Sequence, residues 1–164
     1  ANGGFDYTDS TRIFSQFSER FWLADDLNGW GESSWPEEIW QPTWDSGATS
    51  GIIQSYLRGT VATELDFMDT ASQIASVHNR WRYVFPELDN YLLTSHVHSW
   101  QQERWTGSAY ASPTSSQSTA LQAHLGQAEG SIHFAGEHAS EFHGWIQGAI
   151  ASGMRAANEI HALA

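Results

Sequence analysis

The spacing between hydrophobic positions changes several times along the chain, and each change predicts a new helix, strand or irregular segment. Apolar runs with alternation or aromatic residues predict strands, and apolar positions three or four residues apart predict helices. The strands are expected at residues 12–22, 51–57, 92–100 and 131–135. The helices are expected at residues 60–83, 118–125 and 143–163. Pro86 is expected to end the first helix, because proline lacks the N–H that a helix interior needs.

Residues 24–50 follow neither period and predict an irregular segment. The stretch contains Asn28-Gly29, Trp30-Gly31 and two prolines, which are residues that favour turns. It also contains four tryptophans, so we expect irregular backbone held in place by aromatic side chains.

The last predicted helix carries two stripes of side chains. An apolar stripe follows steps of three and four residues, and it consists of Ile146, Ala149, Ile150, Gly153, Ala157 and Ile160. A stripe of small residues repeats every four positions, and it consists of Gly144, Gly148, Ser152 and Ala156. Each glycine inside a helix costs about 1 kcal/mol relative to alanine. Close approach of another backbone or of a flat ligand would compensate for that cost.

The start of this helix is a candidate binding site. It follows the predicted strand 131–135 and the turn Gly136-Glu137. The first N–H groups of a helix lack acceptors within the helix and carry a partial positive charge. Such a terminus suits a phosphate, a carboxylate or the electron-rich edge of a cofactor. Tight packing of the helix without any ligand explains the same pattern, and the residues alone leave both readings open.

Composition narrows the function classes. The 164 residues suggest one domain or a piece of one, and the hydrophobic share of 40% supports a packed core. Seven arginines against 19 acidic residues give a formal charge of −12, which disfavours nucleic acid and anionic lipid as partners. No apolar run reaches the roughly 18 residues of a membrane helix. Cysteine is absent, so thiolate chemistry and disulfides are excluded within this sequence. Lysine is absent as well.

Residues 132–138 (IHFAGEH) and 143–153 (HGWIQGAIASG) are similar to the C-terminal flavin motif of the flavin-containing amine oxidase family, which includes monoamine, polyamine and L-amino-acid oxidases. Ser99-Trp100 and residues 105–111 (WTGSAYA) are similar to a segment beside the flavin. The resemblance is strong over the last 65 residues or so and looser before them, where residues 17–22 resemble a strand ending in Phe-Trp.

The resemblance implies roles for seven residues. Gly136 and Glu137 would lie at the phosphate and ribityl end of FAD, with Glu137 bonding to it. The backbone N–H of Ile146 would face the N1 and C2-carbonyl edge of the flavin. Trp145 and Tyr110 would form the catalytic pair of aromatic walls around the substrate. Gly144, Trp100 and Trp145 itself would complete the cofactor contacts.

Two positions refine the resemblance. Ala109 stands where monoamine oxidases carry the cysteine that links covalently to flavin, so the FAD is expected to be non-covalent. Trp145, in the run His143-Gly144-Trp145, resembles the L-amino-acid oxidase branch. With no initiator methionine, the chain further resembles one chain of a secreted bacterial L-glutamate oxidase that is matured by proteolysis.

The implied fold is the C-terminal part of a two-domain FAD-dependent amine oxidase, with α/β plus α+β structure. Residues 1–100 would belong to a mixed-sheet substrate-binding domain. Residues 101–164 would return to the FAD-binding domain and close it with strand 131–135 and helix 143–163. The glycine-rich dinucleotide motif and the family's flavin-site lysine are absent from this sequence. The motif and the lysine would therefore lie on partner chains from the same precursor. The processed protomers would form a homo-oligomer. The small-molecule partners would be an amino acid and dioxygen.

Four other functions were considered. An amine or polyamine oxidase subunit, or a non-catalytic structural subunit, would preserve the same motifs. A metal hydrolase could use His133, Glu137, His138, Glu141 and His143. However, the zinc-protease pattern needs two histidines four apart on one helix, and His138 and His143 are five apart, so no metal site is predicted. A serine hydrolase lacks its Gly-x-Ser-x-Gly turn here. For Arg58, a solvated position at a strand end is favoured over a role as the substrate-carboxylate clamp.

Overall fold

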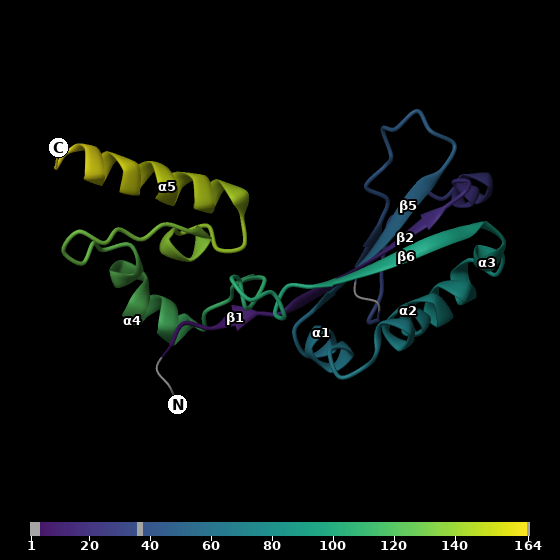
Figure 1. Ribbon diagram of the computed structural model, residues 1–164, viewed down its shortest axis with the longest axis horizontal. Coiled ribbons are helices and arrows are strands. Elements are labelled where there is room, and N and C mark those ends of the chain that lie inside the picture. Colours follow the sequence, from purple (N-terminus) through teal and green to yellow (C-terminus); the bar gives the residue numbers. More distant parts are fainter. Residues whose placement is uncertain (1–3, 36–37, 164) are drawn as a thin grey trace. The chain divides into compact units, whose positions relative to one another are not determined.

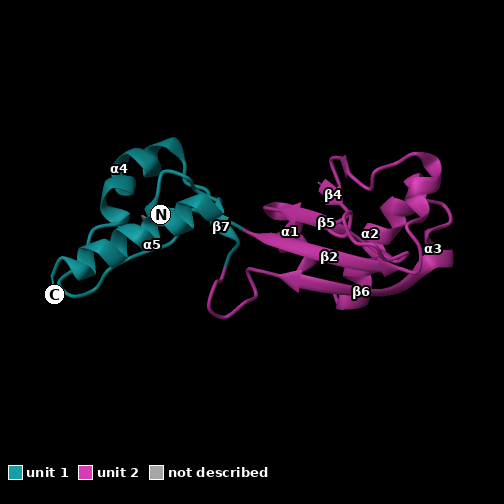
Figure 2. Ribbon diagram, turned by 90° about the horizontal axis from the view of Figure 1, so that it is seen from above, with its two compact units in different colours: residues 1–8, 108–164 teal, residues 9–107 magenta. Residues whose placement is uncertain are grey.

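The computed structural model describes residues 4–35 and 38–163 and divides them into two compact units (Figures 1 and 2). Unit 2 consists of Asp9–Gly107, and unit 1 combines the described residues up to Thr8 with those from Ser108 onward. The division therefore lies seven residues later than the predicted boundary after residue 100, and the N-terminal segment belongs with the C-terminal unit. The assignment of the units to substrate and FAD binding stays a prediction.

Unit 2 is built on an antiparallel sheet in the strand order β3-β4-β5-β2-β6. Its described strands are β2 (Ser10–Phe17), β3 (Gly31–Glu32), β4 (Glu38–Trp40), β5 (Gly51–Arg58) and β6 (Leu92–Ser99). The central strand β2 pairs with β5 along its whole length and with β6 on its other side (Figure 1). The strands expected near residues 51–57 and 92–100 are confirmed, and β3 and β4 lie inside the stretch expected to be irregular.

The strand predicted at residues 12–22 ends at Phe17, which is a correction. Residues Phe21–Asp25 form the 3-10 helix η1 instead. Phe21 and Trp22 are both buried, and their rings contact each other edge to face with centroids 5.2 Å apart. Consecutive residues of a strand point to opposite faces, so a strand could not bury this adjacent pair on one side of the sheet.

The helix predicted at residues 60–83 is two helices, α1 (Thr60–Leu65) and α2 (Thr70–Val84). Asp69 starts α2 as an extended N-cap residue, and its side chain accepts a hydrogen bond of 2.7 Å from the Ser72 N–H. Such a cap competes with continuation of the preceding helix because its backbone is not helical. As expected, α2 ends before Pro86, and the short helix α3 (Leu88–Tyr91) leads into β6.

The core of unit 2 lies where α1, α2 and η1 pack against one face of the sheet. The buried apolar residues of this core are Ile13, Phe17, Phe21, Trp22, Ile53, Leu57, Leu65, Val77, Trp81, Phe85 and Leu88. Burying one such side chain contributes about 1.5–3 kcal/mol. His78 is buried among them, and one of its ring nitrogens lies 2.8 Å from the Ser15 hydroxyl, so the polar ring is satisfied.

Unit 1 contains β1 (Tyr7–Thr8), β7 (Tyr110–Ala111), α4 (Ser115–Leu125), η2 (Glu137–Ala139) and α5 (Ile146–His161). α4 begins three residues before the predicted start, because Thr114 and Gln117 form a capping box there. In the described part of the chain, no helix combines the length and the apolar character needed to cross a bilayer.

Two predictions for the terminal motif need correction. The strand expected at residues 131–135 is not formed; its only pairing is an isolated bridge between Glu129 and Ile132. An extended segment becomes a strand only when a neighbouring backbone pairs with it, and the described residues offer no more than this bridge. The helix expected to begin at residue 143 begins at Ile146, because Trp145 is an extended N-cap and Gly144 has a left-handed backbone with φ of 73°.

Candidate functional site

A short antiparallel ladder positions Tyr110, the first predicted aromatic wall. In β7, Tyr110 pairs with Thr8 and Ala111 pairs with Tyr7. The Ala109 N–H donates to the Thr8 carbonyl at 3.0 Å, and the Ser112 N–H donates to the Asp6 carbonyl at 2.8 Å. Residues more than 100 positions apart in the sequence therefore hold Tyr110 at the edge of unit 1.

Gly144, which precedes the second predicted wall, Trp145, lies against the ring of Tyr110. A Cβ atom on Gly144 would lie 3.2 Å from Cδ2 of the Tyr110 ring, so the ring rests directly against the glycine. The φ of 73° at Gly144 is a conformation that residues with side chains rarely adopt. The Tyr110 ring thus contacts the residue that directly precedes Trp145, the second predicted wall.

Glu137 connects the same two segments. One carboxylate oxygen accepts a hydrogen bond of 2.8 Å from the Ala111 N–H, and the other accepts one of 2.7 Å from the Gly144 N–H. Each oxygen still has a free lone pair, since a carboxylate offers about four acceptor positions. Glu137 can therefore also accept a ligand hydroxyl, and its predicted contact with the cofactor stays a prediction.

The stripe of small residues on α5 faces the backbone of its own unit. Gly148, Ser152 and Ala156 are the buried residues of the helix. A Cβ atom on Gly148 would collide with the Phe142 carbonyl oxygen, so the loop backbone lies directly against the helix axis. Close approach of a backbone, one of the two readings that the sequence left open for this stripe, is observed over Gly148.

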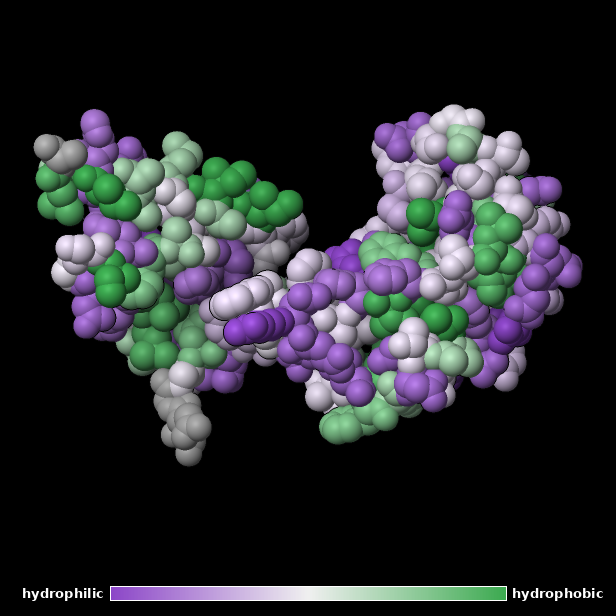
Figure 3. Space-filling model, in the orientation of Figure 1, coloured by the Kyte–Doolittle hydropathy of each residue, from purple (hydrophilic) through white to green (hydrophobic). Residues whose placement is uncertain are grey.

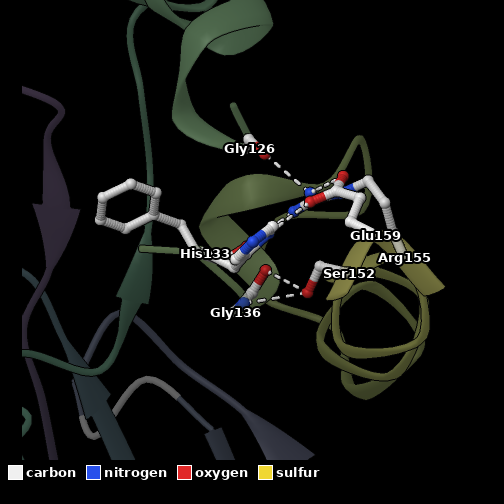
Figure 4. A network of polar contacts seen from close by, with 7 residues as sticks. Gly126, His133, Gly136, Ser152, Arg155 and Glu159 are labelled. Atoms are coloured by element: carbon white, nitrogen blue, oxygen red, sulfur yellow. Dashed lines mark hydrogen bonds and ion pairs between the residues drawn. The ribbon is translucent and has the colours of Figure 1, made fainter. Parts of the chain in front are cut away.

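Ser152 fixes the position of Gly136 on this face. Its hydroxyl oxygen accepts a hydrogen bond of 2.9 Å from the Gly136 N–H and lies 2.7 Å from the Gly136 carbonyl, to which it donates (Figure 4). Gly136, predicted to lie at the phosphate end of the cofactor, is therefore anchored to α5 through both of its backbone polar groups.

A second group of side chains fastens the segment before Gly136 to α5. Arg155 donates to the carbonyls of Gly126 and Phe134, both at 2.7 Å, and to Glu159 at 2.6 Å (Figure 4). The other oxygen of Glu159 lies 3.0 Å from His133 Nδ1. The hydrogen bonds from His133 and Arg155 lower the pKa of Glu159. This network orders the approach to the Gly136 turn.

The N-terminal end of α5 is open. Ile146 and Trp145 are 79% and 64% exposed, and the Ile146 and Gln147 N–H groups make no hydrogen bond among the described residues. Unpaired N–H groups at a helix start donate readily to an acceptor with partial negative charge. The N1 and C2-carbonyl edge of a flavin is such an acceptor, so the residues present fit the cofactor that the resemblance implies.

Tyr7 and two histidines surround the Glu137 carboxylate region. Burial and the nearby charge of Glu137 both raise the pKa of Tyr7, so its hydroxyl stays protonated at neutral pH. The Tyr7 ring lies 6.4 Å from that of His138, and Phe5 contacts His143 edge to face at 5.4 Å. The N-terminal segment therefore covers one side of the turn that precedes α5.

Trp100, the remaining predicted cofactor residue, lies in unit 2. It follows β6, and its ring contacts His98 edge to face with centroids 4.4 Å apart. Unit 1 thus brings together Tyr110, Gly136, Glu137, Gly144, Trp145 and Ile146 from the predicted site. The participation of Trp100 in that site stays a prediction.

Arg12 is a possible functional residue that the sequence analysis missed. Its guanidinium carbon lies 4.1 Å from the Tyr56 ring centroid and 5.2 Å from that of Trp40, and it donates to Gln54 at 3.1 Å. It forms no ion pair with a carboxylate among the described residues. The alternation of β2 places Arg12 on the face opposite the core residues Ile13 and Phe17, but the neighbouring strands that supply the rings become known only from the sheet.

The structure gives the metal-hydrolase alternative no support. In residues 4–35 and 38–163, no three His, Cys, Asp or Glu side chains are grouped to hold a metal ion. His133 is bonded to Glu159, and Glu137 accepts hydrogen bonds from backbone N–H groups.

Comparison with protein families gives a match over nearly the whole chain. Residues 1–161 match the model of a family described as flavin containing amine oxidoreductase. The chain is 28% identical over 165 residues to an L-amino-acid oxidase of Gloydius halys, covering 94% of this chain and 32% of the relative. It is 29% identical over 163 residues to a putative L-amino-acid oxidase of Bacillus subtilis, covering 96% and 34%.

Solved structures agree on the fold. A putrescine oxidase bound to putrescine superposes with a TM-score of 0.78 at 22% identity, covering 95% of this chain and 36% of that one. The cyclohexylamine oxidase of Brevibacterium oxydans superposes with a TM-score of 0.82 at 16% identity, covering 93% and 35%. The chain thus spans about a third of the length of the proteins that it matches.

Proposed function

The chain belongs to the family of flavin-containing amine oxidoreductases, and from this premise we propose that it is part of an FAD-dependent L-amino-acid oxidase. The observation that carries the proposal is the junction of Tyr110 with Gly144-Trp145 at the open start of α5. The similarity to L-amino-acid oxidases at 28–29% identity supports the choice of amino acids over simple amines.

The proposed reaction converts an L-amino acid, dioxygen and water into a 2-oxo acid, ammonia and hydrogen peroxide. The flavin supplies the two-electron oxidation when it is bound. The open N–H groups at the start of α5 would hold its electron-rich edge and stabilise negative charge there. Tyr110 and Trp145 would bind and orient the substrate between their ring faces, which favours the reactive arrangement and excludes water.

The proposal includes partner chains from the same precursor, and it takes them from the resemblance to proteolytically matured oxidases. The outward face of α5 supports this: Ile146, Ile150, Met154 and Ile160 are each more than half exposed. In Figure 3, hydrophobic atoms gather along the upper edge of unit 1, over α5. An apolar face of this kind is typical of a surface that another part of a protein covers. The covering part would carry the dinucleotide-binding motif and the flavin-site lysine.

L-Glutamate as the substrate and secretion of a processed homo-oligomer complete the proposal. Both derive from the resemblance to bacterial L-glutamate oxidases. Mass spectrometry of the native protein and of separated culture medium would test processing and secretion; a single 18.3 kDa species would contradict processing, and a protein found only inside cells would contradict secretion.

The decisive experiment is a visible absorption spectrum of the native assembly, followed by anaerobic addition of L-glutamate and then of other L-amino acids. We expect an oxidised-flavin spectrum that is bleached by L-glutamate. Bleaching by another L-amino acid would retain the oxidase and change the substrate. Bleaching by amines alone would support an amine oxidase, as in the putrescine and cyclohexylamine oxidases of similar fold. A flavin bleached by neither would favour a non-catalytic subunit.

A further inference from the structure

We infer that Glu137 is the positioning residue of the aromatic pair: its carboxylate sets the separation between the strand that carries Tyr110 and the turn that carries Trp145. The inference rests on the proposed function, because that function gives the pair its role. It assigns to Glu137 a task different from the predicted contact with the cofactor.

The two oxygens of one carboxylate hold two separate backbone segments. The Ala111 N–H, at 2.8 Å from Oε1, belongs to the residue after Tyr110. The Gly144 N–H, at 2.7 Å from Oε2, belongs to the residue before Trp145. Hydrogen bonds from N–H groups to a carboxylate are shorter and about twice as strong as those between neutral groups. Each aromatic wall is therefore one residue away from a strong bond to the same side chain.

Neither N–H group is used by regular secondary structure. The ladder between β1 and β7 uses the N–H groups of Ala109 and Ser112, so that of Ala111 points away from β1. Gly144 precedes α5 and lies outside its hydrogen-bonding pattern. Without Glu137, both donors would lose their acceptor, and the contact of the Tyr110 ring with Gly144 would remain as the direct link.

The arrangement requires two acceptors at a fixed distance. Glutamine offers one acceptor oxygen and an NH2 group that only donates, so it can satisfy one of the two N–H groups but not both. Aspartate keeps two acceptors on a side chain that is shorter by one methylene. A displacement of about 1 Å in a reactive arrangement can reduce turnover by about 100-fold. A modest change at Glu137 should therefore act on catalysis through Tyr110 and Trp145.

The test uses the complete flavin-containing enzyme with Glu137→Gln, and with Glu141→Gln as the matched control. Glu141 is exposed, lies in the same loop and makes no hydrogen bond within the described residues, so its replacement removes the same charge. We expect Glu137→Gln to lower kcat by about 10- to 100-fold with unchanged FAD affinity. Glu141→Gln should leave both unchanged. Loss of FAD affinity with unchanged kcat in the flavin-saturated enzyme would overturn the inference and identify Glu137 as a cofactor ligand alone.

A double-mutant cycle separates positioning from an independent effect. Once Trp145→Ala has removed one wall, adding Glu137→Gln should cost much less than it does in the wild-type background. Residues that act as one unit show such non-additive effects, whereas independent residues are additive. Equal costs in both backgrounds would contradict a positioning role.

Amide hydrogen exchange tests the geometry without relying on activity. In the wild-type enzyme, the Ala111 and Gly144 amides should exchange well below the rate of an unprotected chain, and Glu137→Gln should accelerate both. Unprotected exchange in the wild type would refute the inference even if every Glu137 variant failed to assemble. If a flavin-containing wild type oxidises no L-amino acid, the proposed function fails, while the exchange rates still decide whether Glu137 links the two segments.

Discussion

Individual polar side chains in this protein hold backbone segments that secondary structure leaves unpaired. Glu137 binds the N–H groups of Ala111 and Gly144, and Ser152 binds both backbone polar groups of Gly136. In unit 2, His78 and Ser15 satisfy each other within the core. The Ser15–His78 pair is buried, where a polar group without a partner costs about 1–3 kcal/mol, whereas the bond from Gly144 to Glu137 is exposed.

Replacing Trp145 tests the aromatic wall directly. Trp145→Ala should lower kcat/KM by about 10- to 100-fold, because the substrate loses one of the two faces that orient it. FAD should remain bound, since the backbone N–H groups at the start of α5 are unaffected. Steady-state kinetics and the flavin absorbance of the purified variant provide the measurement. Unchanged kinetics would remove Trp145 from the site, and Trp44→Ala, another exposed tryptophan at 73% exposure, is the control.

The buried His78 should make stability depend on pH. Burial, with a smaller contribution from Arg82, lowers its pKa in the folded state. Below the ordinary histidine value of about 6.5, the unfolded chain therefore binds a proton that the folded chain does not. The free energy of unfolding should fall as pH decreases through that region and stay insensitive to His78 above it.

Denaturant unfolding at several pH values between about 5 and 8 measures this effect around the ordinary histidine pKa. His78→Gln should flatten the dependence, because it removes the buried imidazole. An equally steep pH dependence in the His78→Gln variant would assign the effect to other groups.

At the level of elements, close packing against α5 compensates for the free-energy cost of the glycines inside this helix. Its small residues let the loop that contains Ser140 and Phe142 lie against the helix axis. The helix is then fastened by Ser152, Arg155 and Glu159 to the segment that precedes Gly136. The close approach, and not the helix propensity of the sequence, stabilises this element.

Two glycines of α5 provide a matched pair for testing this account. Gly148→Ala should destabilise the protein by about 1–3 kcal/mol, because the new methyl group would collide with the Phe142 carbonyl. Gly153→Ala should stabilise it by about 1 kcal/mol, because nothing lies within 4 Å of the added Cβ and alanine favours the helix. Thermal unfolding of the two variants compares them; equal shifts would mean that the close approach at Gly148 has no energetic effect.

At the level of the whole molecule, each unit has its own packing and its own exposed apolar residues. Unit 2 surrounds a core of large apolar side chains, and its tryptophans at positions 30, 44 and 105 are more than half exposed. The buried apolar residues described in unit 1 are the small Ala111 and Ala156, and the unit exposes Trp145 and the outer face of α5. Both observations agree with a chain that spans about a third of its relatives.

The absence of cysteine makes a prediction about the assembled protein. With Ala109 in place of a cysteine and no cysteine elsewhere in the sequence, this chain offers no thiol for a covalent link to flavin. Precipitation of the native enzyme with acid should therefore release all of the yellow colour into the supernatant. Colour that remains in the pellet would show a covalent link through another residue or another chain.

The sequence by itself determined the family, the alternation of β5 and β6, the end of α2 before Pro86 and the run from Gly136 to Ile146 that contains most of the candidate site. These features depend on residues close together in the chain, so periodicity, proline and a long motif suffice to identify them. The sequence could not indicate that α1 and α2 are separate or that Phe21 begins a 3-10 helix.

Only the tertiary structure decided which distant segments meet. It joined residues 7–8 to 110–111, placed Tyr110 against Gly144 and connected both to Glu137. It placed Arg12 between two aromatic rings and left residues 131–135 without a strand partner beyond one bridge. Such pairings depend on backbone hydrogen bonds and ring contacts between residues far apart in the chain. Local patterns identify the backbone groups that need hydrogen-bond partners, but the tertiary fold determines which groups pair with them.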